Sequence, residues 1–475
     1  MKNINKTIVV KYSGILLLFL LIATSCKKLI EVPANPIDQI PQSHVFADSS
    51  DIIGAMAGIY TNFGVGVGSL NFGSGQITIN TGLTGDELVP QIAFGGDDVE
   101  LYQTAILPAN GKDGTTWTDA YKCIYQMNVC LAGISSTNAI SPALKKQLLA
   151  EIKVTRALYY FNMVNTWGAV PLILSTDYTL TKSQPRAPVD TIYKQILADL
   201  TSAESNLNSN YPSAGRARPN KYVAEALLSK VYLYRGMWQQ ALTASNDVIN
   251  SGLYSLTTDL NAVFLDGSTE ALWQLPANSQ YEATPEGFAL LPNDGQNLSY
   301  AYAPQYALSQ ELISSFENGD NRMNQWTVSY ALNGTNYSVA YKYKNLSSTA
   351  SPTEDYMVIR LAELYLIRAE ALAHTGNFTG AMADVNLIRQ RAGLLPAAAI
   401  SQTDVLVAIM KERRIELFCE WGNRWFDLNR TGTINTVLSA EKTGWKPTRS
   451  LFPNPITELQ SNPFLTQNPG YPGAK

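Results

Sequence analysis

Apolar side chains recur with a helical period over several long segments of the chain. Between Leu144 and Thr166 they fall three and four residues apart, the spacing of one face of an α-helix. This segment runs into Gly168 and then Pro171, a combination that typically ends a helix. The same period predicts helices that start near Ser49, near Thr116 and at Val189. The chain is therefore predicted to be mostly α-helical.

Two helical segments resemble each other, which indicates an internal repeat. Residues 224–250 and 362–390 superpose so that four positions match in kind: Tyr232 with Leu372, Gly236 with Gly376, Trp238 with Phe378, and Ala241 with Ala381. A Gly between helices, an aromatic two residues later and then a small residue is typical of a tetratricopeptide hairpin. Helix pairs over 49–134 and 144–207 are candidates for two more hairpins. About four hairpins would stack into a curved α scaffold.

Two long segments lack this period. Gly64–Gly114 is rich in Gly, and Ser251–Thr353 is rich in Tyr, Asn, Gly and Pro, with a helical pattern only near residues 309–317. We call them the two excursions. Short strands are predicted within them at residues 76–79, 273–275, 323–330 and 337–343. Because long irregular segments in a compact protein usually carry function, the excursions are predicted to form a binding face.

The N-terminus has the pattern of a lipoprotein signal peptide over residues 1–25. Basic residues precede an apolar stretch that is too short for an ordinary membrane span, and small residues precede Cys26. A lipid on Cys26 would anchor the chain to a membrane surface without spanning it. The alternative is a plain secretory peptide with an incidental Cys. Residues 26–475 are predicted to form one body, with halves at 26–230 and 231–475 and the larger excursion at 251–353.

Charge and cysteine usage exclude several function classes. The net charge is −4 with no basic block, which argues against a nucleic-acid partner. Cys123 and Cys130 share one face of a predicted helix, about 10 Å apart and too far for a disulfide. They are interpreted, like Cys419, as small buried apolar residues. The metal-ligand spacings CxxC and HxxxH do not occur in the sequence, so no zinc site is predicted.

Charged and aromatic residues alternate between Lys411 and Gly432, although only 16% of the chain is charged. Buried charges must be paired and hydrogen-bonded, so this stretch is predicted to be a helix end held by ion pairs under an aromatic cover. The side chains expected to bind one another and the backbone, as a structural signature, are Glu412, Arg413, Arg414, Glu416, Arg424, Trp425 and Asp427.

A carbohydrate site needs aromatic planes for the apolar faces of sugar rings, and carboxylates or amides for the hydroxyls. The excursions hold residues of both kinds. The predicted ligand-binding residues are Phe94, Tyr102, Asp86, Tyr281, Phe288, Tyr300, Tyr302, Asn324 and Trp326. The alternative for each is a loop residue that packs on the scaffold.

Catalysis is not predicted. Asp86-Glu87 and Asp97-Asp98 are carboxylate pairs, but neighbours on an extended segment point apart, which does not suit glycoside hydrolysis. Only two His are present, and neither has a second His or a nucleophile in a catalytic pattern. No cofactor is predicted; the alternatives for Asp97-Asp98 are a bound Ca²⁺ and a solvated turn.

Taken together, the motifs resemble the SusD/RagB family of outer-membrane lipoproteins of gut-type Bacteroidota, over essentially the whole mature chain. The resemblance rests on Cys26 and its tether, on Arg156–Phe161 leading to Trp167–Leu172, and on Arg360–Glu363. Its most specific motif is Glu412–Leu417 followed by Arg424–Leu428 and Arg430, and the tail Leu451–Pro455 also agrees.

This resemblance implies a SusD-like fold and no catalytic activity. Such proteins capture a nutrient, commonly a glycan and in some members a peptide, and deliver it to a SusC-like TonB-dependent transporter. It also implies a lipid-anchored protein exposed at the cell surface. The residues after Cys26 are less acidic than the usual surface-export signal, which leaves a periplasmic orientation open. The alternative functions are a lipid-anchored glycan-active hydrolase, a peptide-binding protein and a helical scaffold for protein partners.

Overall fold

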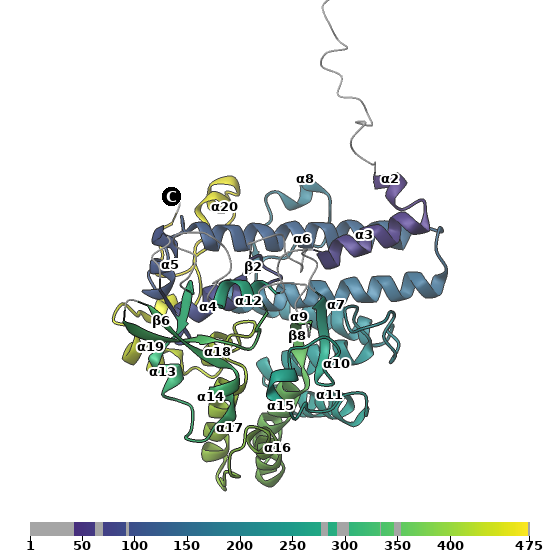
Figure 1. Ribbon diagram of the computed structural model, residues 1–475. Helices are drawn as coiled ribbons and strands as arrows, with labels where there is room; N and C mark the ends of the chain where they lie inside the picture. Colours follow the sequence, from purple (N-terminus) through teal and green to yellow (C-terminus); the bar gives the residue numbers. More distant parts are fainter. Residues whose placement is uncertain are drawn as a thin grey trace, which may run out of the picture.

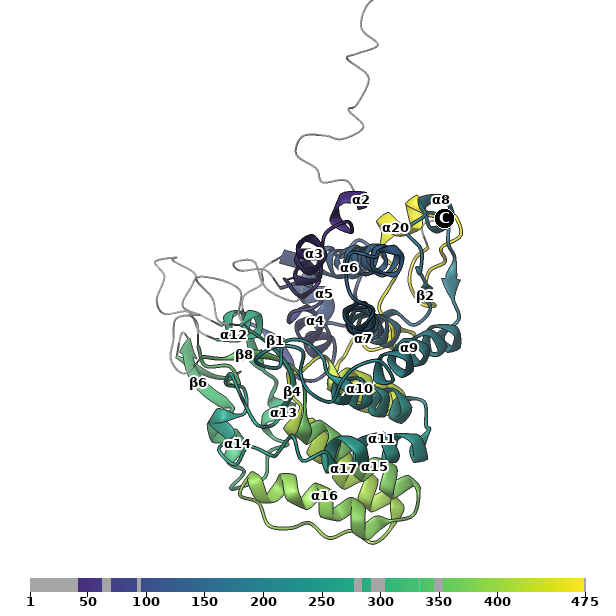
Figure 2. The ribbon, with the colours of Figure 1, turned by 90° about the vertical axis from the view of Figure 1, so that its right-hand side faces the viewer.

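A stack of antiparallel helices forms the frame of the protein. The computed structural model describes residues 42–61, 70–91, 95–276, 284–291, 304–332, 334–345 and 353–473, so the signal peptide and Cys26 lie outside the described residues. Helices that follow one another along the stack pack together (Figures 1 and 2). They are α3 (Ser49–Thr61), α6 (Gly111–Ser136), α7 (Pro142–Trp167), α9 (Val189–Glu204), α10 (Lys221–Tyr234), α11 (Trp238–Asn250), α15 (Leu361–His374), α16 (Phe378–Arg391) and α17 (Gln402–Glu416). The prediction of a mostly helical fold is confirmed.

The boundaries of α7, which begins two residues before the predicted start, follow from its capping residues. The Ser141 side chain accepts a hydrogen bond from the backbone N–H of Leu144, and Pro142 occupies the first turn, where its missing N–H is not needed. At the other end Gly168 has φ 73°, a left-handed conformation that Gly adopts without steric penalty. The helix stop read from the sequence is therefore confirmed.

The two repeat hairpins are α10–α11 and α15–α16. Gly236 and Gly376 make the turns with φ values of 66° and 86°, and Ala241 and Ala381 are fully buried where the helices touch. The hairpins meet through Trp238 and His374, whose rings stack at 3.7 Å with an angle of 5°. The predicted role of the Gly and Ala positions is confirmed.

The four sheets in the described part of the chain are all two-stranded and antiparallel. They pair β1 (Leu88–Pro90) with β5 (Tyr306–Leu308), β2 (Val170–Pro171) with β3 (Arg186–Ala187), β4 (Ala271–Pro276) with β8 (Asp355–Arg360), and β6 (Thr327–Leu332) with β7 (Thr335–Ala340). The strands predicted at 273–275 and 337–343 are confirmed in the main. The strand predicted at 323–330 is wrong in its first half, because Asp320 caps a short helix, α14 (Asn321–Gln325).

The first excursion is more regular than the sequence predicts. Residues 76–79, expected as a strand, belong to α4 (Gln76–Thr84), and α5 (Gly95–Tyr102) follows. All nine residues of α4 are buried, and its polar side chains bond within the protein; for example, Gln76 Nε2 donates to Asn80 Oδ1 at 2.6 Å. A helix buried on every side has no polar face, so it shows no helical period.

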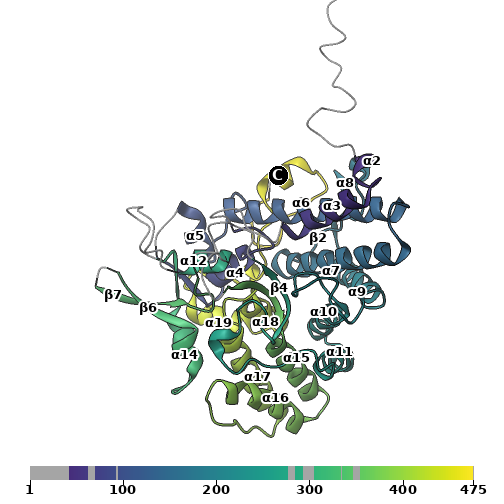
Figure 3. The ribbon, with the colours of Figure 1, turned by 45° about the vertical axis from the view of Figure 1, so that its right-hand side comes forward.

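The remaining elements complete the body. They are α2 (Gln42–Val45), α8 (Tyr178–Thr181), η2 (Leu260–Ala262), α12 (Pro285–Leu290), α13 (Gln310–Ile313), α18 (Asn423–Arg430), α19 (Ile434–Glu441), η3 (Pro447–Arg449) and α20 (Ile456–Ser461). Figures 2 and 3 show α12 and the β6–β7 hairpin on the side of the molecule away from α9 to α11. Cys123, Cys130 and Cys419 are buried and free, as predicted. Among the residues that the structure describes, no helix combines the length and apolarity needed to cross a bilayer.

Candidate functional site

The charged stretch Lys411–Gly432 is not one helix. α17 ends at Glu416 and α18 begins at Asn423, and Cys419 lies in the turn between them, which corrects its predicted place inside a helix. Cys419 and Trp421 have φ values of 52° and 49°, a left-handed backbone that non-Gly residues rarely adopt. Such strain persists only where surrounding contacts hold it.

Side chains from distant parts of the chain hold this turn. The backbone N–H of Trp421 donates to Thr78 Oγ1 at 2.9 Å, which fastens the turn to α4. Lys342 Nζ donates to the carbonyls of Glu416 at 2.9 Å and Phe418 at 2.8 Å. A cation at the end of a helix satisfies carbonyls that have no partner within the helix and favours the negative end of its dipole.

Glu416 is the centre of a buried charge network. Its carboxylate lies 2.9 Å from Arg322 Nη1 and 2.5 Å from Arg360 Nη1, and it also pairs with Arg391. Burial alone would raise the pKa of Glu416, but the guanidiniums of Arg391, Arg360 and Arg322 outweigh it and hold the pKa well below its usual range. Glu416 is therefore ionised and its charge is shared among three cations.

The predicted signature pairs internally at only one point. Arg413 Nε donates to Asp427 at 2.7 Å, but the other charged members find partners elsewhere in the chain. Glu412 pairs with Arg322, and both Arg414 and Arg424 pair with Asp86. The expectation that these side chains bind one another is therefore met by Arg413 and Asp427, whereas the other charged members tie the helix end to other elements. Trp425 is buried and packs edge-on against Trp445 and Phe452.

Two predicted ligand-binding residues are structural instead. Asp86 is 2% exposed, and its Oδ2 lies 2.6 Å from Arg424 Nη2 and 2.8 Å from Arg414 Nη2. Burial alone would raise its pKa, but the hydrogen bonds and charge of Arg424 and the charge of Arg414 outweigh burial and lower the pKa. Trp326 is fully buried and donates Nε1–H to the Leu260 carbonyl at 2.9 Å. A covered ring has no free face for a sugar, so both residues are removed from the predicted site.

The other predicted residues have different surroundings. Tyr102 is half-buried, with Lys442 Nζ 3.9 Å from its ring centre. Phe288 is half-buried on α12, and Asn324 is exposed on α14. The predicted residues that lie outside the described residues are Phe94, Tyr281, Tyr300 and Tyr302.

The Asp97-Asp98 pair is bonded within the protein. Asp98 pairs with Lys112 at 2.5 Å, and Asp97 accepts a hydrogen bond from the Gly111 N–H at 3.1 Å. No group of three or more His, Cys, Asp or Glu side chains suited to a metal ion occurs within the described ranges. The proposal of a Ca²⁺ ion therefore gains no support from this region of the fold.

The two excursions meet on one side of the helical stack. β1 of the first pairs with β5 of the second, and the Gln91 N–H donates to the Gln305 carbonyl at 2.9 Å just beyond this pairing. Lys112 Nζ bonds both Asp98 and the hydroxyl of Tyr306, at 2.5 and 2.8 Å. We call the region where α5, β1, β5 and α12 meet the excursion face; β5 is buried within it, and Tyr102 and Phe288 are half-buried at its edge. The two excursions therefore lie together on one helical frame, as the sequence indicated.

Glu286, on α12 at the excursion face, is a buried acid. Burial raises its pKa from 4.5 to about 8, so the folded protein holds a proton that the unfolded chain releases near pH 4.5. Stability contributed by this proton is present below pH 4.5 and is lost as the pH rises through about 8.

Glu286→Gln should remove this pH-dependent loss of stability. We expect the variant to gain roughly 3 kcal/mol over the wild type between pH 5 and pH 8, measured by urea unfolding. The exposed Glu311→Gln serves as control, and an equal gain there would contradict the assignment.

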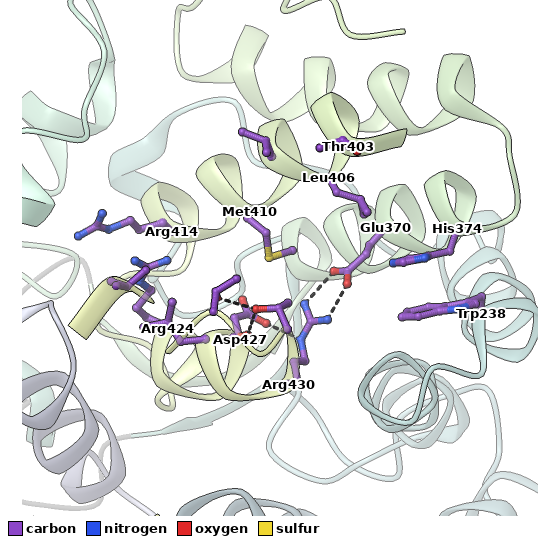
Figure 4. Close-up of a pocket in the computed structure, with 15 residues that line it drawn as sticks. Trp238, Glu370, His374, Thr403, Leu406, Met410, Arg414, Arg424, Asp427 and Arg430 are labelled. Carbon is purple, nitrogen blue, oxygen red and sulfur yellow. Dashed lines mark hydrogen bonds and ion pairs between the residues drawn. The ribbon is translucent and has the colours of Figure 1, made fainter. Parts of the chain in front are cut away.

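A second feature, which the sequence reasoning missed, is a groove of about 570 Å³ between α17 and the α18–α19 segment (Figure 4). Thr403, Leu406, Val407 and Met410 of α17 line it at a spacing of three and four residues. That stripe was visible in the sequence, but the position of α18 and α19 opposite it was not. Figure 4 shows Trp238 and His374 at one end of the groove and Arg414 and Arg424 at the other.

Comparisons with known proteins give consistent matches. The family model described as "SusD family" matches residues 278–471, and the one described as "Starch-binding associating with outer membrane" matches residues 56–233. "SusD-like protein P25" of Formosa agariphila is 28% identical, and the match covers 74% of this chain and 78% of that protein.

Solved structures match over most of the chain. A SusD superfamily protein from Bacteroides vulgatus superposes with a TM-score of 0.76 at 20% identity, covering 90% of this chain and 100% of that one. A "Laminarin binding SusD-like protein" superposes with a TM-score of 0.75 at 26% identity, again covering 90% of this chain and 100% of the other. The first match bears on the fold alone, whereas the second also has a stated glycan ligand.

Proposed function

Because the chain belongs to the SusD/RagB family, we propose that it binds a neutral glycan and delivers it to a SusC-like TonB-dependent transporter. The observation that carries the ligand class is the similarity to the laminarin-binding protein, at 26% identity with a TM-score of 0.75. Laminarin binding is a property of that relative, and a neutral glucan is therefore the first ligand to test on this chain.

The excursion face is the surface we propose for the glycan. The two excursions join there through β1 and β5, and Phe288 of α12 supplies an aromatic ring that is only half-buried. The charged groups in this region already have partners, as in the Asp98–Lys112 pair. A surface whose charges are paired favours hydroxyl and apolar contacts over a polyanionic ligand. The predicted Phe94, Tyr281, Tyr300 and Tyr302 flank these elements in the sequence.

We also propose that a lipid on Cys26 holds the protein at the outer membrane, facing the cell surface. The family description of outer-membrane association supports this location. Fifteen residues, 27–41, separate Cys26 from α2, where the described chain begins. Fifteen residues span at most about 50 Å, which limits how far the body can lie from its anchor. Labelling with palmitate in cells, lost in Cys26→Ala, would test the anchor.

A binding screen tests the glycan proposal. Protein lacking residues 1–26 should bind laminarin in calorimetry and in affinity gels without releasing shorter sugars. The double variant Tyr300→Ala/Tyr302→Ala should bind roughly tenfold more weakly, about 1.4 kcal/mol, because stacked aromatic rings contribute affinity of this order. Its melting temperature should stay close to that of the wild type.

Tyr178→Ala is the matched control, since Tyr178 is 71% exposed on α8 and lies outside the excursion face. Equal binding by the wild type and the double variant would reject the proposed surface. Release of oligosaccharides would instead favour the hydrolase alternative, and heat from peptides but not from glycans would favour peptide binding. Co-purification of a TonB-dependent transporter from detergent-solubilised outer membranes tests the delivery step.

A further inference from the structure

The groove beside α17 has an apolar floor that no described element covers. Leu406, Val407 and Met410 project from α17, and Leu428 and Val437 face them from the opposite wall. Val407 is 63% exposed although it lies within a helix whose other faces pack on α15 and α16. A volume of about 570 Å³ lies within the range of roughly 300–1,000 Å³ that is typical of ligand pockets. The groove is therefore large enough for a small molecule.

The two ends of the groove differ in charge. Arg414 and Arg424 line one end, with side chains that are 15% and 12% exposed (Figure 4). Asp86 is the only carboxylate in the described part of the chain that forms an ion pair with either guanidinium. Arg424 takes both oxygens of Asp86, while Arg414 Nε is buried without a hydrogen-bond acceptor. Two guanidiniums thus share one carboxylate.

Neighbouring groups only partly offset this positive charge. Glu441 interacts with both guanidiniums but does not line the groove, and burial raises its pKa to about 7, so it carries about half a charge at neutral pH. At the middle of the groove, Arg430 binds Glu370 through two hydrogen bonds of 2.6 and 2.7 Å, and Asp427, the other carboxylate that lines the groove, is shared between Arg430 and the buried Arg413. The surplus positive charge is therefore confined to the Arg414 and Arg424 end.

We propose that this groove binds an amphiphilic carboxylate, an unbranched alkyl chain with a carboxylate head group. The alkyl chain would lie along Leu406, Val407 and Met410, and the carboxylate would bind Arg414 and Arg424. Guanidiniums pair well with carboxylates because their planar N–H groups match the two oxygens. A glycan suits the groove poorly, because the apolar floor offers few partners for hydroxyl groups and Trp238 already stacks on His374.

Three probes that share a dodecyl chain and differ only in the head group separate the contribution of the apolar floor from that of the charged end. Dodecanoate, dodecanol and dodecyltrimethylammonium should be titrated into the protein lacking residues 1–26 by calorimetry, with the two ionic probes below their micelle concentrations and dodecanol below its solubility limit. We expect dodecanoate to bind at least tenfold more tightly than dodecanol, and the cation to bind most weakly. Laminarin should not compete with dodecanoate, so failure of the glycan proposal and failure of this one remain distinguishable.

Val407→Asp places a carboxylate on the exposed part of the floor and should weaken dodecanoate binding at least tenfold. Leu387→Asp is the matched control, since Leu387 is 42% exposed on the neighbouring helix α16 and lies outside the groove. Circular dichroism of both variants would verify the fold. Equal affinity for the three probes, or equal loss in both variants, would overturn the proposal. Binding of none of the probes would overturn it as well and would favour a polypeptide occupant.

Discussion

Glu416→Gln is expected to lower the free energy of unfolding by about 3 kcal/mol, because it removes the anion that three buried cations share. Each cation keeps another carboxylate partner, Glu412 for Arg322 and Glu270 for Arg360 and Arg391, so the cluster loses one charge of its balance and not all of it. Arg322 and Arg360 have side chains that are only 1% exposed, and Arg391 is 4% exposed. Gln fills nearly the same volume as Glu, so the loss would report charge and not packing. Urea unfolding followed by circular dichroism at pH 7 measures it.

Glu317→Gln is the matched control. Glu317 also pairs with two cations, Arg389 and Lys411, but its side chain is 33% exposed and Lys411 is 48% exposed. Solvent screens such a pair, so the expected loss is at most about 1 kcal/mol. Similar losses in the two variants would show that burial of Glu416 does not amplify its charge interactions, which would contradict the role given to the network.

The helical frame could be predicted from the sequence because its signals are local. The period of α7 and its Gly168 stop lie within one segment, and both appear in the structure where the pattern indicated. Helix α4 could not be predicted, because a helix buried on all sides shows no polar face. Its helical state depends on neighbours such as Thr116, which bonds Asn80 from outside the segment.

The candidate site was harder to predict, since residue type in a loop does not reveal what covers it. Asp86 in the first excursion looked like a free carboxylate, but its cations lie more than three hundred residues later, at Arg414 and Arg424. The charged signature raised the same difficulty. Its composition indicated ion pairs correctly, but most partners, such as Arg322 and Arg360, lie outside the stretch.

The long-range ion pairs connect the helical stack to both excursions, so they separate residues that hold the fold from residues that are free to contact a ligand. The charge network joins α17 and α18 to the second excursion through Arg322 and Lys342, and to the first through Asp86. It therefore anchors the base of both excursions in the helical stack. Substitutions in the excursions away from this network can then alter ligand contacts without disturbing the frame, which is why the glycan test uses Tyr300 and Tyr302, which flank the excursion face in the sequence.

Trp326→Ala should destabilise the protein by about 3–5 kcal/mol, because removing a large buried ring leaves a cavity that the surroundings fill only in part. Trp326 is fully buried. Its Nε1–H donates to the Leu260 carbonyl, and Lys342 Nζ lies 4.8 Å from its ring centre. The substitution would leave that carbonyl without its donor and remove a ring from the buried Lys342 cation.

We expect Trp326→Ala to lower the melting temperature and to leave the laminarin affinity of the folded molecules unchanged. Asn324→Ala, two residues away and exposed, should change stability by less than about 0.5 kcal/mol. Weaker binding by folded Trp326→Ala would return this residue to the ligand site, whereas unchanged binding would confirm that Trp326 supports the base of the excursion without touching the ligand.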